Sequence, residues 1–264
     1  MARTGIRILE TRVAFVEAVI ALHKGWTRTG MDAQRRAQAV IDAANTALGT
    51  YKVPKVTFGF TGQSSAFAAE LDHRDWRIDL DRRAFDSPGP PSNAHMSELV
   101  DSVYHESRHA EQWFLAARYR IGEGWSTDQL IRNGLKRSVA VAAAFAPMVT
   151  GSPEEGLAKR LAESLMTDAG FKRLAQTQKD MEVLADGSTA TAKEKEDAFK
   201  RLQALGYLKG KYDPGALQWY AHKAYQSQFP ETDAWDTGRL AAELYQRLAH
   251  MKIPPEPVRV LVHV

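Results

Sequence analysis

Apolar residues recur at helical spacing through the first fifth of the chain. Val13, Val16 and Ile20 lie three or four positions apart, so they fall on one face of a helix. A second run with the same spacing follows after Gly30, where a helix would end. We therefore predict two N-terminal helices within residues 1–52.

The spacing changes to strict alternation in the next segment, residues 53–82. Ile78 and Leu80 alternate with charged residues, as on a strand that buries one face. A similar alternation runs through residues 56–60, and the polar residues 73–75 can form the turn of a hairpin. The pattern predicts a small antiparallel sheet over residues 53–82.

Helical spacing returns after the breaker sequence DSPGPPSN, residues 86–93. We predict a long helix over residues 93–121 and a helical segment, with loops, over residues 123–214. The helices that we expect beyond the long helix span residues 127–147, 154–183, 192–205, 215–228 and 231–250. Alternating valines in the tail, residues 251–264, predict an edge strand.

The composition is typical of a folded globular protein. The 264 residues are 44% hydrophobic and 25% charged, and a chain of this length can bury a sizeable core. We predict one α+β domain over residues 1–264, mainly helical. The chain contains no cysteine, so any metal must be held by histidine, aspartate or glutamate.

The charge pattern argues against two classes of partner. The net charge is only +3 and basic residues are interleaved with acids, so we expect no nucleic-acid partner. The longest apolar run, residues 138–149, is too short for a membrane span.

Glu10, Arg12 and Glu17 interrupt the N-terminal apolar patch, which is not typical of a signal peptide. We expect a cytoplasmic protein, or one that is secreted or injected without a signal peptide.

The sequence YHESRHAEQWF, residues 104–114, contains the motif H-E-x-x-H. His105 and His109 lie four positions apart, so on a helix both imidazoles can reach one metal ion. Glu106 follows the first histidine and can accept a proton from a water that the metal activates. The motif therefore predicts a zinc site with its own general base.

A small sheet followed by an H-E-x-x-H helix resembles the zincin metallopeptidases, and HESRHAEQ is similar to the H-E-x-R-H-x-x-Q helices of bacterial toxin-like and effector-associated metallopeptidase domains. The resemblance implies a zincin-like fold, in which the strand before the helix holds the substrate backbone and residues 123–214 form a helical insertion. Arg108 and Glu111 depart from the stricter family signature, and we expect both side chains to point to solvent.

A zinc site of this kind needs a third protein ligand and an open position for water. The spacing of Glu231 and Ala234 is similar to the E-x-x-A helix that supplies this ligand in gluzincin-like families. The resemblance therefore implies that Glu231, within the helices of residues 215–250, is the third ligand. The alternatives are His222, Glu163 and Asp168.

Four further residues are candidates for supporting roles. Tyr225 or Tyr220 can donate a hydrogen bond to the oxygen that becomes negative during the reaction. Asp233 or Asp236 can orient a ligand imidazole. We expect the remaining histidines to be surface or helix-cap residues.

These residues predict a zinc metallopeptidase that hydrolyses peptide bonds, with Zn²⁺ as cofactor, a protein or peptide as substrate and Glu106 as general base. A narrower hypothesis is a specific bacterial toxin or effector protease with an immunity or secretion-system partner. The alternative is a non-catalytic helical binding or structural module, in which the motif is accidental or degenerate.

Overall fold

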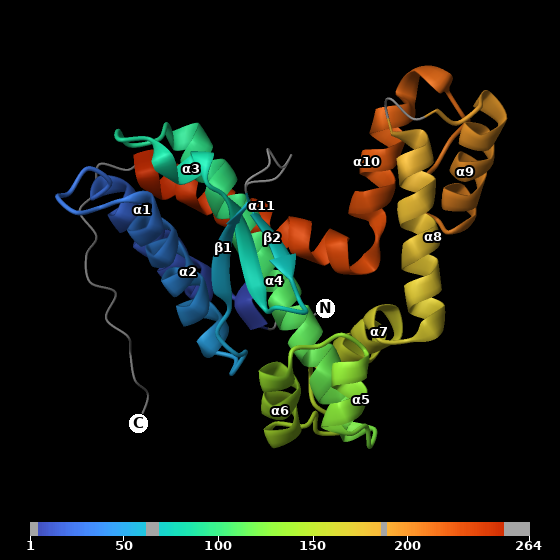
Figure 1. The fold of residues 1–264 in the computed structure, drawn as a ribbon, viewed down its shortest axis with the longest axis horizontal. Helices are drawn as coiled ribbons and strands as arrows, with labels where there is room; N and C mark the ends of the chain where they lie inside the picture. The colour runs from blue at the N-terminus through green and yellow to red at the C-terminus, as the bar shows by residue number, and fades with distance from the viewer. Residues whose placement is uncertain (1–4, 62–68, 186–188, 251–264) are drawn as a thin grey trace.

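Helices make up most of the chain, and one small sheet lies among them (Figure 1). The structure, a computed structural model, describes residues 5–61, 69–185 and 189–250. The helices are η1 (Gly5–Arg7), α1 (Leu9–Lys24), α2 (Ala33–Gly49), α3 (Arg83–Asp86), α4 (Asn93–Gly122), α5 (Thr127–Arg132), α6 (Arg137–Phe145), α7 (Glu155–Leu165), α8 (Asp168–Leu184), α9 (Ala192–Ala204), η2 (Pro214–Ala216), α10 (Leu217–Ser227) and α11 (Phe229–His250). The strands are β1 (Thr57–Thr61), β2 (Ala69–Asp72) and β3 (Arg77–Asp81). Within the described ranges, every helix is too short or too polar to cross a membrane.

The sheet is mixed, with the strand order β1-β3-β2. The predicted hairpin is present, because β2 and β3 pair antiparallel on either side of a tight turn. The prediction of a purely antiparallel sheet is wrong, since β1 pairs parallel to β3. Alternating apolar residues encode which face of a strand is buried, but they do not encode the direction of its neighbour.

The sheet packs on the helices through its two outer strands, on either side of the buried central strand β3. Its apolar residues Ile78 and Leu80 are fully buried, while α2 packs against β1 and α4 packs against β2. Asn45 of α2 fixes the start of β1: its amide donates to Val56 O at 2.9 Å and its oxygen accepts from Val56 N at 2.8 Å. The sheet is thereby held at a fixed place beside α4.

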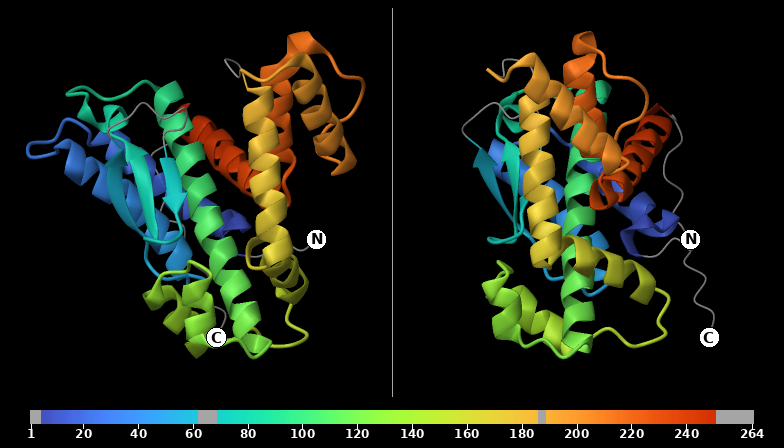
Figure 2. Two further views of the ribbon diagram at one scale, coloured as in Figure 1. Left: turned by 45° about the vertical axis from the view of Figure 1, so that its right-hand side comes forward. Right: turned by 90° about the vertical axis from the view of Figure 1, so that its right-hand side faces the viewer.

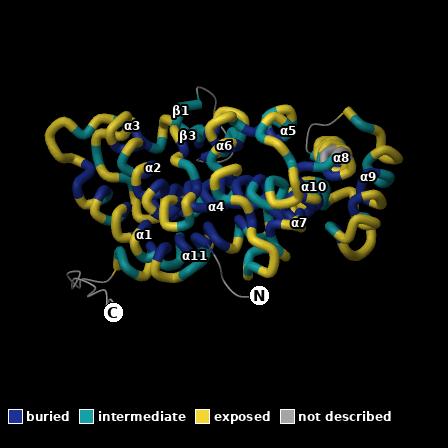
Figure 3. The backbone as a smooth tube through the Cα atoms, turned by 90° about the horizontal axis from the view of Figure 1, so that it is seen from below, coloured by how far each residue is buried: buried dark blue, intermediate teal, exposed yellow. Residues whose placement is uncertain are grey.

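Helix α4 is the central element of the molecule, as predicted for residues 93–121. It begins after Ser92, whose hydroxyl accepts from His95 N at 3.2 Å, and it contains no proline or internal glycine. Helices α2, α6, α7 and α11 and strand β2 contact it. Because these elements surround α4, the residues in the middle of the helix are buried on nearly every face. They appear dark blue at the centre of Figure 3.

Helix α11 lies against α4 at very short range. A Cβ atom added at Gly238 would lie 2.6 Å from the carbonyl oxygen of Asp101 and 3.1 Å from the Cβ atom of His105. Only glycine therefore permits this approach of the two backbones. The contact sets the position of α11 relative to the H-E-x-x-H motif.

Helices α8, α9 and α10 form an arm that projects from the rest of the molecule (Figure 2). The arm has its own apolar cluster, which includes Leu184, Phe199 and Leu202. Asp180 of α8, whose side chain is fully buried, accepts from Arg201 of α9 at 2.7 Å. The second cluster makes the arm a separate packing unit joined to the larger body.

Two predicted helices are each divided in the structure. The helix predicted over residues 127–147 breaks into α5 and α6 at Gly134, which has a φ of +89°. The helix predicted over residues 154–183 breaks into α7 and α8 at Thr167, whose hydroxyl accepts from Gly170 N at 2.9 Å. Both breaks coincide with a turn or capping residue. The strand predicted in the tail lies outside the described residues.

Candidate metal centre

Three of the predicted donor atoms converge between α4 and α11. The Nε2 atoms of His105 and His109 lie 2.9 Å apart. Oε2 of Glu231, in the first turn of α11, lies 3.4 Å from the first nitrogen and 3.3 Å from the second. Ligand atoms around a tetrahedral zinc ion with bonds of about 2.0–2.1 Å lie about 3.3 Å apart. The two distances to Glu231 match this spacing, whereas the two imidazoles lie about 0.4 Å closer, at hydrogen-bonding distance. The three atoms can therefore converge on one metal ion after a small separation of the imidazoles.

Glu106 also lies within reach of the two imidazoles, so the third donor must be chosen between two carboxylates. The donor atoms of His105, Glu106 and His109 all lie within 4.8 Å of one another. However, Oε2 of Glu106 accepts from Leu71 N of β2 at 2.8 Å, and its Oε1 is 3.7 Å from His105 Nε2. Oε2 of Glu231 is closer to both imidazoles, is buried and accepts no hydrogen bond of good geometry. Glu231 is the better third donor.

The electrostatics of the cluster favour a positive charge among these groups. Burial alone would lower the pKa of His109, but the neighbouring Glu231 and Glu106 carboxylates raise it to about 9. Burial would raise the pKa of Glu231, but the two imidazoles hold it well below its usual range. The carboxylates that stabilise a proton on His109 would also stabilise a bound divalent cation. The charges of the cluster are therefore compatible with a metal ion.

The environment of Glu106 suits a proton acceptor. Burial raises the pKa of its carboxyl to about 7, although His109 and the Leu71 amide oppose the rise. A general base acts best when its pKa lies near the working pH. The Leu71 amide of β2 therefore holds Glu106 beside the donors. Its pKa of about 7 would suit a general base at neutral pH.

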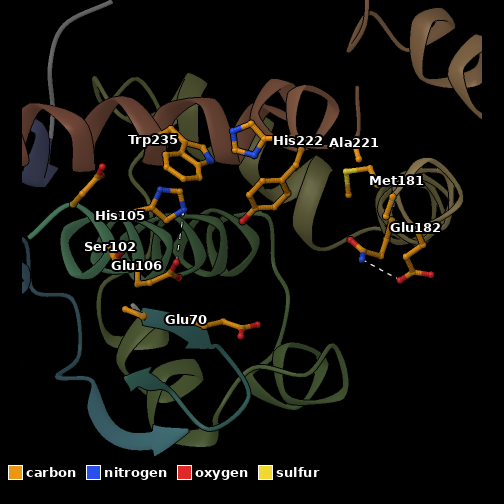
Figure 4. Close-up of a pocket in the computed structure, with 14 residues that line it drawn as sticks. Glu70, Ser102, His105, Glu106, Met181, Glu182, Ala221, His222 and Trp235 are labelled. Carbon is orange, nitrogen blue, oxygen red and sulfur yellow. Dashed lines mark hydrogen bonds and ion pairs between the residues drawn. The ribbon is translucent and has the colours of Figure 1, made fainter. Parts of the chain in front are cut away.

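Two cavities reach the cluster, one lined by His105 and the other by His109. The larger, of about 480 Å³, is lined by His105, Trp235 and side chains of the arm such as Met181 (Figure 4). The smaller, of about 220 Å³, is lined by His109 and Glu231, among others. Glu70, Glu106 and Tyr225 line both cavities. A long substrate could extend to either side of the donor cluster.

Tyr225 of α10 lies beside the third donor. Burial, and then the charge and hydrogen bonding of Glu231, raise the pKa of its hydroxyl above the usual value. The hydroxyl therefore stays protonated and can act as a hydrogen-bond donor. The other tyrosine considered, Tyr220, donates to Lys211 O at 3.0 Å within the arm and lines neither cavity.

The alternative third donors lie elsewhere. His222 lines the larger cavity but is not in the donor cluster. Glu163 is exposed on α7. The side chain of Asp168 lies outside the described part of the chain. Asp236, considered as an orienting residue, is exposed and lies 3.7 Å from Arg239.

Arg108 and Glu111 differ from the prediction most clearly. Both were expected to point to solvent, but their side chains are 0% and 2% exposed. They form an ion pair with each other, and Arg108 Nε also donates to Asp233 Oδ2 at 2.6 Å. Two charges of opposite sign can be buried when each has partners. Besides each other, Arg108 and Glu111 have partners from segments far away in the sequence, which are Asp233 and Ile6.

Sequence reasoning gave Gln112 no role, although it contacts a donor directly. Its side-chain oxygen lies 2.8 Å from Nδ1 of His109, and the residue is fully buried. Two signals in the sequence pointed to it: its position one turn after His109 on a helix, and its place as the glutamine of the H-E-x-R-H-x-x-Q pattern. Among the remaining histidines, His73 is half-buried and stacks on Trp113 with ring centroids 4.1 Å apart.

Comparisons with other proteins give no relative. No protein-family model matches the sequence, and neither a curated protein nor a solved structure matches it. The geometry of the donor cluster is therefore the basis for a functional conclusion. That cluster consists of two imidazoles, one carboxylate with an oxygen near both of them, and a second carboxylate at their side.

Proposed function

We propose that the protein is a zinc-dependent metallopeptidase of zincin type, in which His105, His109 and Glu231 hold the metal. The observation that carries the proposal is the convergence of their three donor atoms within 3.4 Å of one another. Two imidazoles and one carboxylate are the donor set of a hydrolytic zinc site that keeps one position open. A zinc ion bound there would act as a Lewis acid towards the peptide carbonyl and would activate water.

Glu106 is the general base in this proposal. Its carboxylate lies next to the donors, is fixed by the Leu71 amide and faces both cavities. It accepts the proton of the attacking water and passes this proton to the amine that leaves. Tyr225 of α10, which also lines both cavities, donates a hydrogen bond to the carbonyl oxygen as negative charge develops on it.

Strand β2 supports the choice of a peptide as substrate. Among the described strands, β2 pairs only with β3, so its other edge faces the donor cluster. An extended peptide can pair with such an edge, which would place its backbone along the two cavities. The cavities then receive the side chains on either side of the bond to be cleaved.

Replacing Glu106 by glutamine tests the proposal. Glu106→Gln keeps the size and most contacts of the side chain, so we expect bound zinc to remain and kcat to fall by about 10²–10⁴-fold. Glu98→Gln, on an exposed face of the same helix, is the matched control and should leave kcat unchanged. Cleavage at the parental rate by Glu106→Gln would remove Glu106 from the mechanism.

Metal analysis separates the proposal from the alternative of a non-catalytic helical module. Protein purified without added zinc should contain about one zinc per chain if the donor set is a site. An accidental motif would hold no stoichiometric metal. A dedicated effector protease would hold zinc and cleave one protein while leaving generic peptides intact.

A further inference from the structure

The side chain of Gln112 connects the two helices that carry the donors. Its oxygen faces Nδ1 of His109 at 2.8 Å. Its nitrogen donates to Pro230 O at 2.9 Å and to Asp233 Oδ2 at 3.0 Å, both on α11. Pro230 directly precedes Glu231. One amide group therefore contacts a donor on α4 and the backbone next to a donor on α11.

These contacts fix which way the amide points. Pro230 O and Asp233 Oδ2 are both acceptors, so they require the two N–H bonds of the amide group. The amide oxygen must then face His109, and only a protonated Nδ1 can donate to it. Metal binding requires that Nε2 lose its proton. With the remaining proton on Nδ1, the imidazole then presents the lone pair of Nε2 to the space between the three donor atoms.

Asp233 is itself held by two guanidinium groups, one fully buried and one partly exposed. Its Oδ2 accepts from Arg108 at 2.6 Å, and its Oδ1 pairs with Arg7 of η1 at 2.6 Å. Glu111 completes the group: it pairs with Arg108 and accepts from Ile6 N at 3.2 Å. The N-terminal turn therefore contacts this network directly. Two guanidiniums and two carboxylates balance in charge, which permits the burial of Arg108 and Glu111.

We infer that Gln112 is a positioning residue of the candidate metal centre. It fixes the tautomer and ring orientation of His109 and couples them to the position of Glu231, while Asp233, Arg108 and Arg7 hold its amide in one orientation. The inference rests on the proposed function, because it assigns the outer support of the same metal site. Partners of this kind set the ligand geometry and the metal affinity.

Zinc affinity and the His109 ring proton together test the inference. Gln112→Met removes both polar ends at similar volume, and we expect the zinc dissociation constant to rise about 10–100-fold. Gln112→Asn keeps the amide but shortens the side chain, so it should show the same loss and serves if the first variant does not fold. Gln246→Met is the matched control, because Gln246 joins α11 to Ser97 of α4 at the far end of the helix.

Nitrogen-edited NMR of the metal-free protein gives the second readout. The Nδ1–H proton of His109 should be protected from exchange with water in the parent and the Gln246 variant, and unprotected in both Gln112 variants. A merely structural role of Gln112 would not change this single proton.

The possible outcomes separate the two claims. Equal zinc affinity in the parent and the Gln112 variants would overturn the positioning role and leave the proposed function standing. A parent that binds no stoichiometric zinc would overturn the proposed function. In that case the NMR measurement still decides the role of Gln112, since an unprotected Nδ1–H in the parent would overturn it.

Discussion

The body of the molecule and its helical arm contribute different things to the same site. All three proposed zinc donors belong to α4 and α11, which lie in the large core of the body. The arm contributes Tyr225 and one wall of the larger cavity, including Met181 (Figure 4). The positions of the proposed donors therefore depend on the most buried helices, whereas one wall of the cavity beside them belongs to a smaller unit.

The two regions also differ in how much packing stabilises them. The arm has eight buried apolar residues in its own cluster, and the body cluster is several times larger. Small cores are marginally stable, because little apolar surface is removed from water. We therefore expect the arm to open locally at a lower free energy than the body.

The largest effect should follow from removing the centre of the arm. Phe199 is 2% exposed and packs against Tyr220 with ring centroids 4.6 Å apart. Phe199→Ala should cost about 3–5 kcal/mol, enough to unfold the arm alone. Zinc affinity should survive while kcat/KM falls, because the donors lie in the body and one cavity wall is lost. Calorimetric zinc titration and peptidase kinetics measure the two effects.

A matched substitution in the body gives the contrast. Phe15 is 1% exposed in α1 and packs against Tyr104 of α4. Phe15→Ala should lower the free energy of unfolding of the whole body and weaken zinc binding with it. Equal losses of zinc affinity in the two phenylalanine variants would show that the arm and body are one cooperative unit.

The next effect concerns the close approach of α11 to α4. In Gly238→Ala, the new methyl group would lie 2.6 Å from the carbonyl oxygen of Asp101, which cannot rotate away. Helix α11 must then move, so we expect about 1–3 kcal/mol of destabilisation and weaker zinc binding through Glu231. Thermal unfolding and zinc titration check both.

Gly156→Ala is the control for Gly238→Ala. Gly156 is exposed on α7, and no other atom lies within 4 Å of the added methyl group. Alanine favours the helical backbone, so this variant should be stabilised by less than about 1 kcal/mol, with unchanged zinc affinity. A neutral Gly238→Ala would mean that the two helices can separate without affecting the donors.

The sequence predicts the parts of the fold that are specified locally. Helix α4 follows from its periodicity, its Ser92 cap and the absence of breakers. The divided helices were missed because their apolar spacing continues through Gly134 and Thr167, where the turn and the cap override it. The direction of β1 depends on a pairing with β3 across the fold, which alternation does not specify.

The candidate site also combines features that the local sequence specifies with features that depend on tertiary contacts. The spacing of His105 and His109 on one helix predicts their convergence, and a family resemblance pointed to Glu231. The surroundings of Arg108 could not be predicted, because its partner Asp233 lies 125 residues away. A charged residue on a helix is usually solvated, and only the tertiary contacts of this chain make burial favourable.

The smallest predicted effect lies at the boundary between body and arm, where Asp101 lines the larger cavity. Its Oδ1 is buried without a hydrogen-bond partner. Burial raises the pKa of Asp101 to about 6 from an ordinary value of 3.8, although Arg239 opposes the rise. The folded state therefore keeps the proton longer than the unfolded state, so stability falls as the pH rises from about 4 to 6.

Asp101→Asn should remove this penalty, since a neutral amide of the same shape has no charge to desolvate. Above pH 6 we expect the variant to be more stable than the parent by about 1 kcal/mol, a value reduced by the partial exposure of the side chain. Urea unfolding at a series of pH values measures the difference, which should shrink towards pH 4. Asp236→Asn, an exposed neighbour of the same Arg239, should show no such gain. A stability difference that stays constant with pH would mean that the Asp101 carboxylate is solvated. Water would then reach the α4 side of the cavity as freely as it reaches the side formed by the arm.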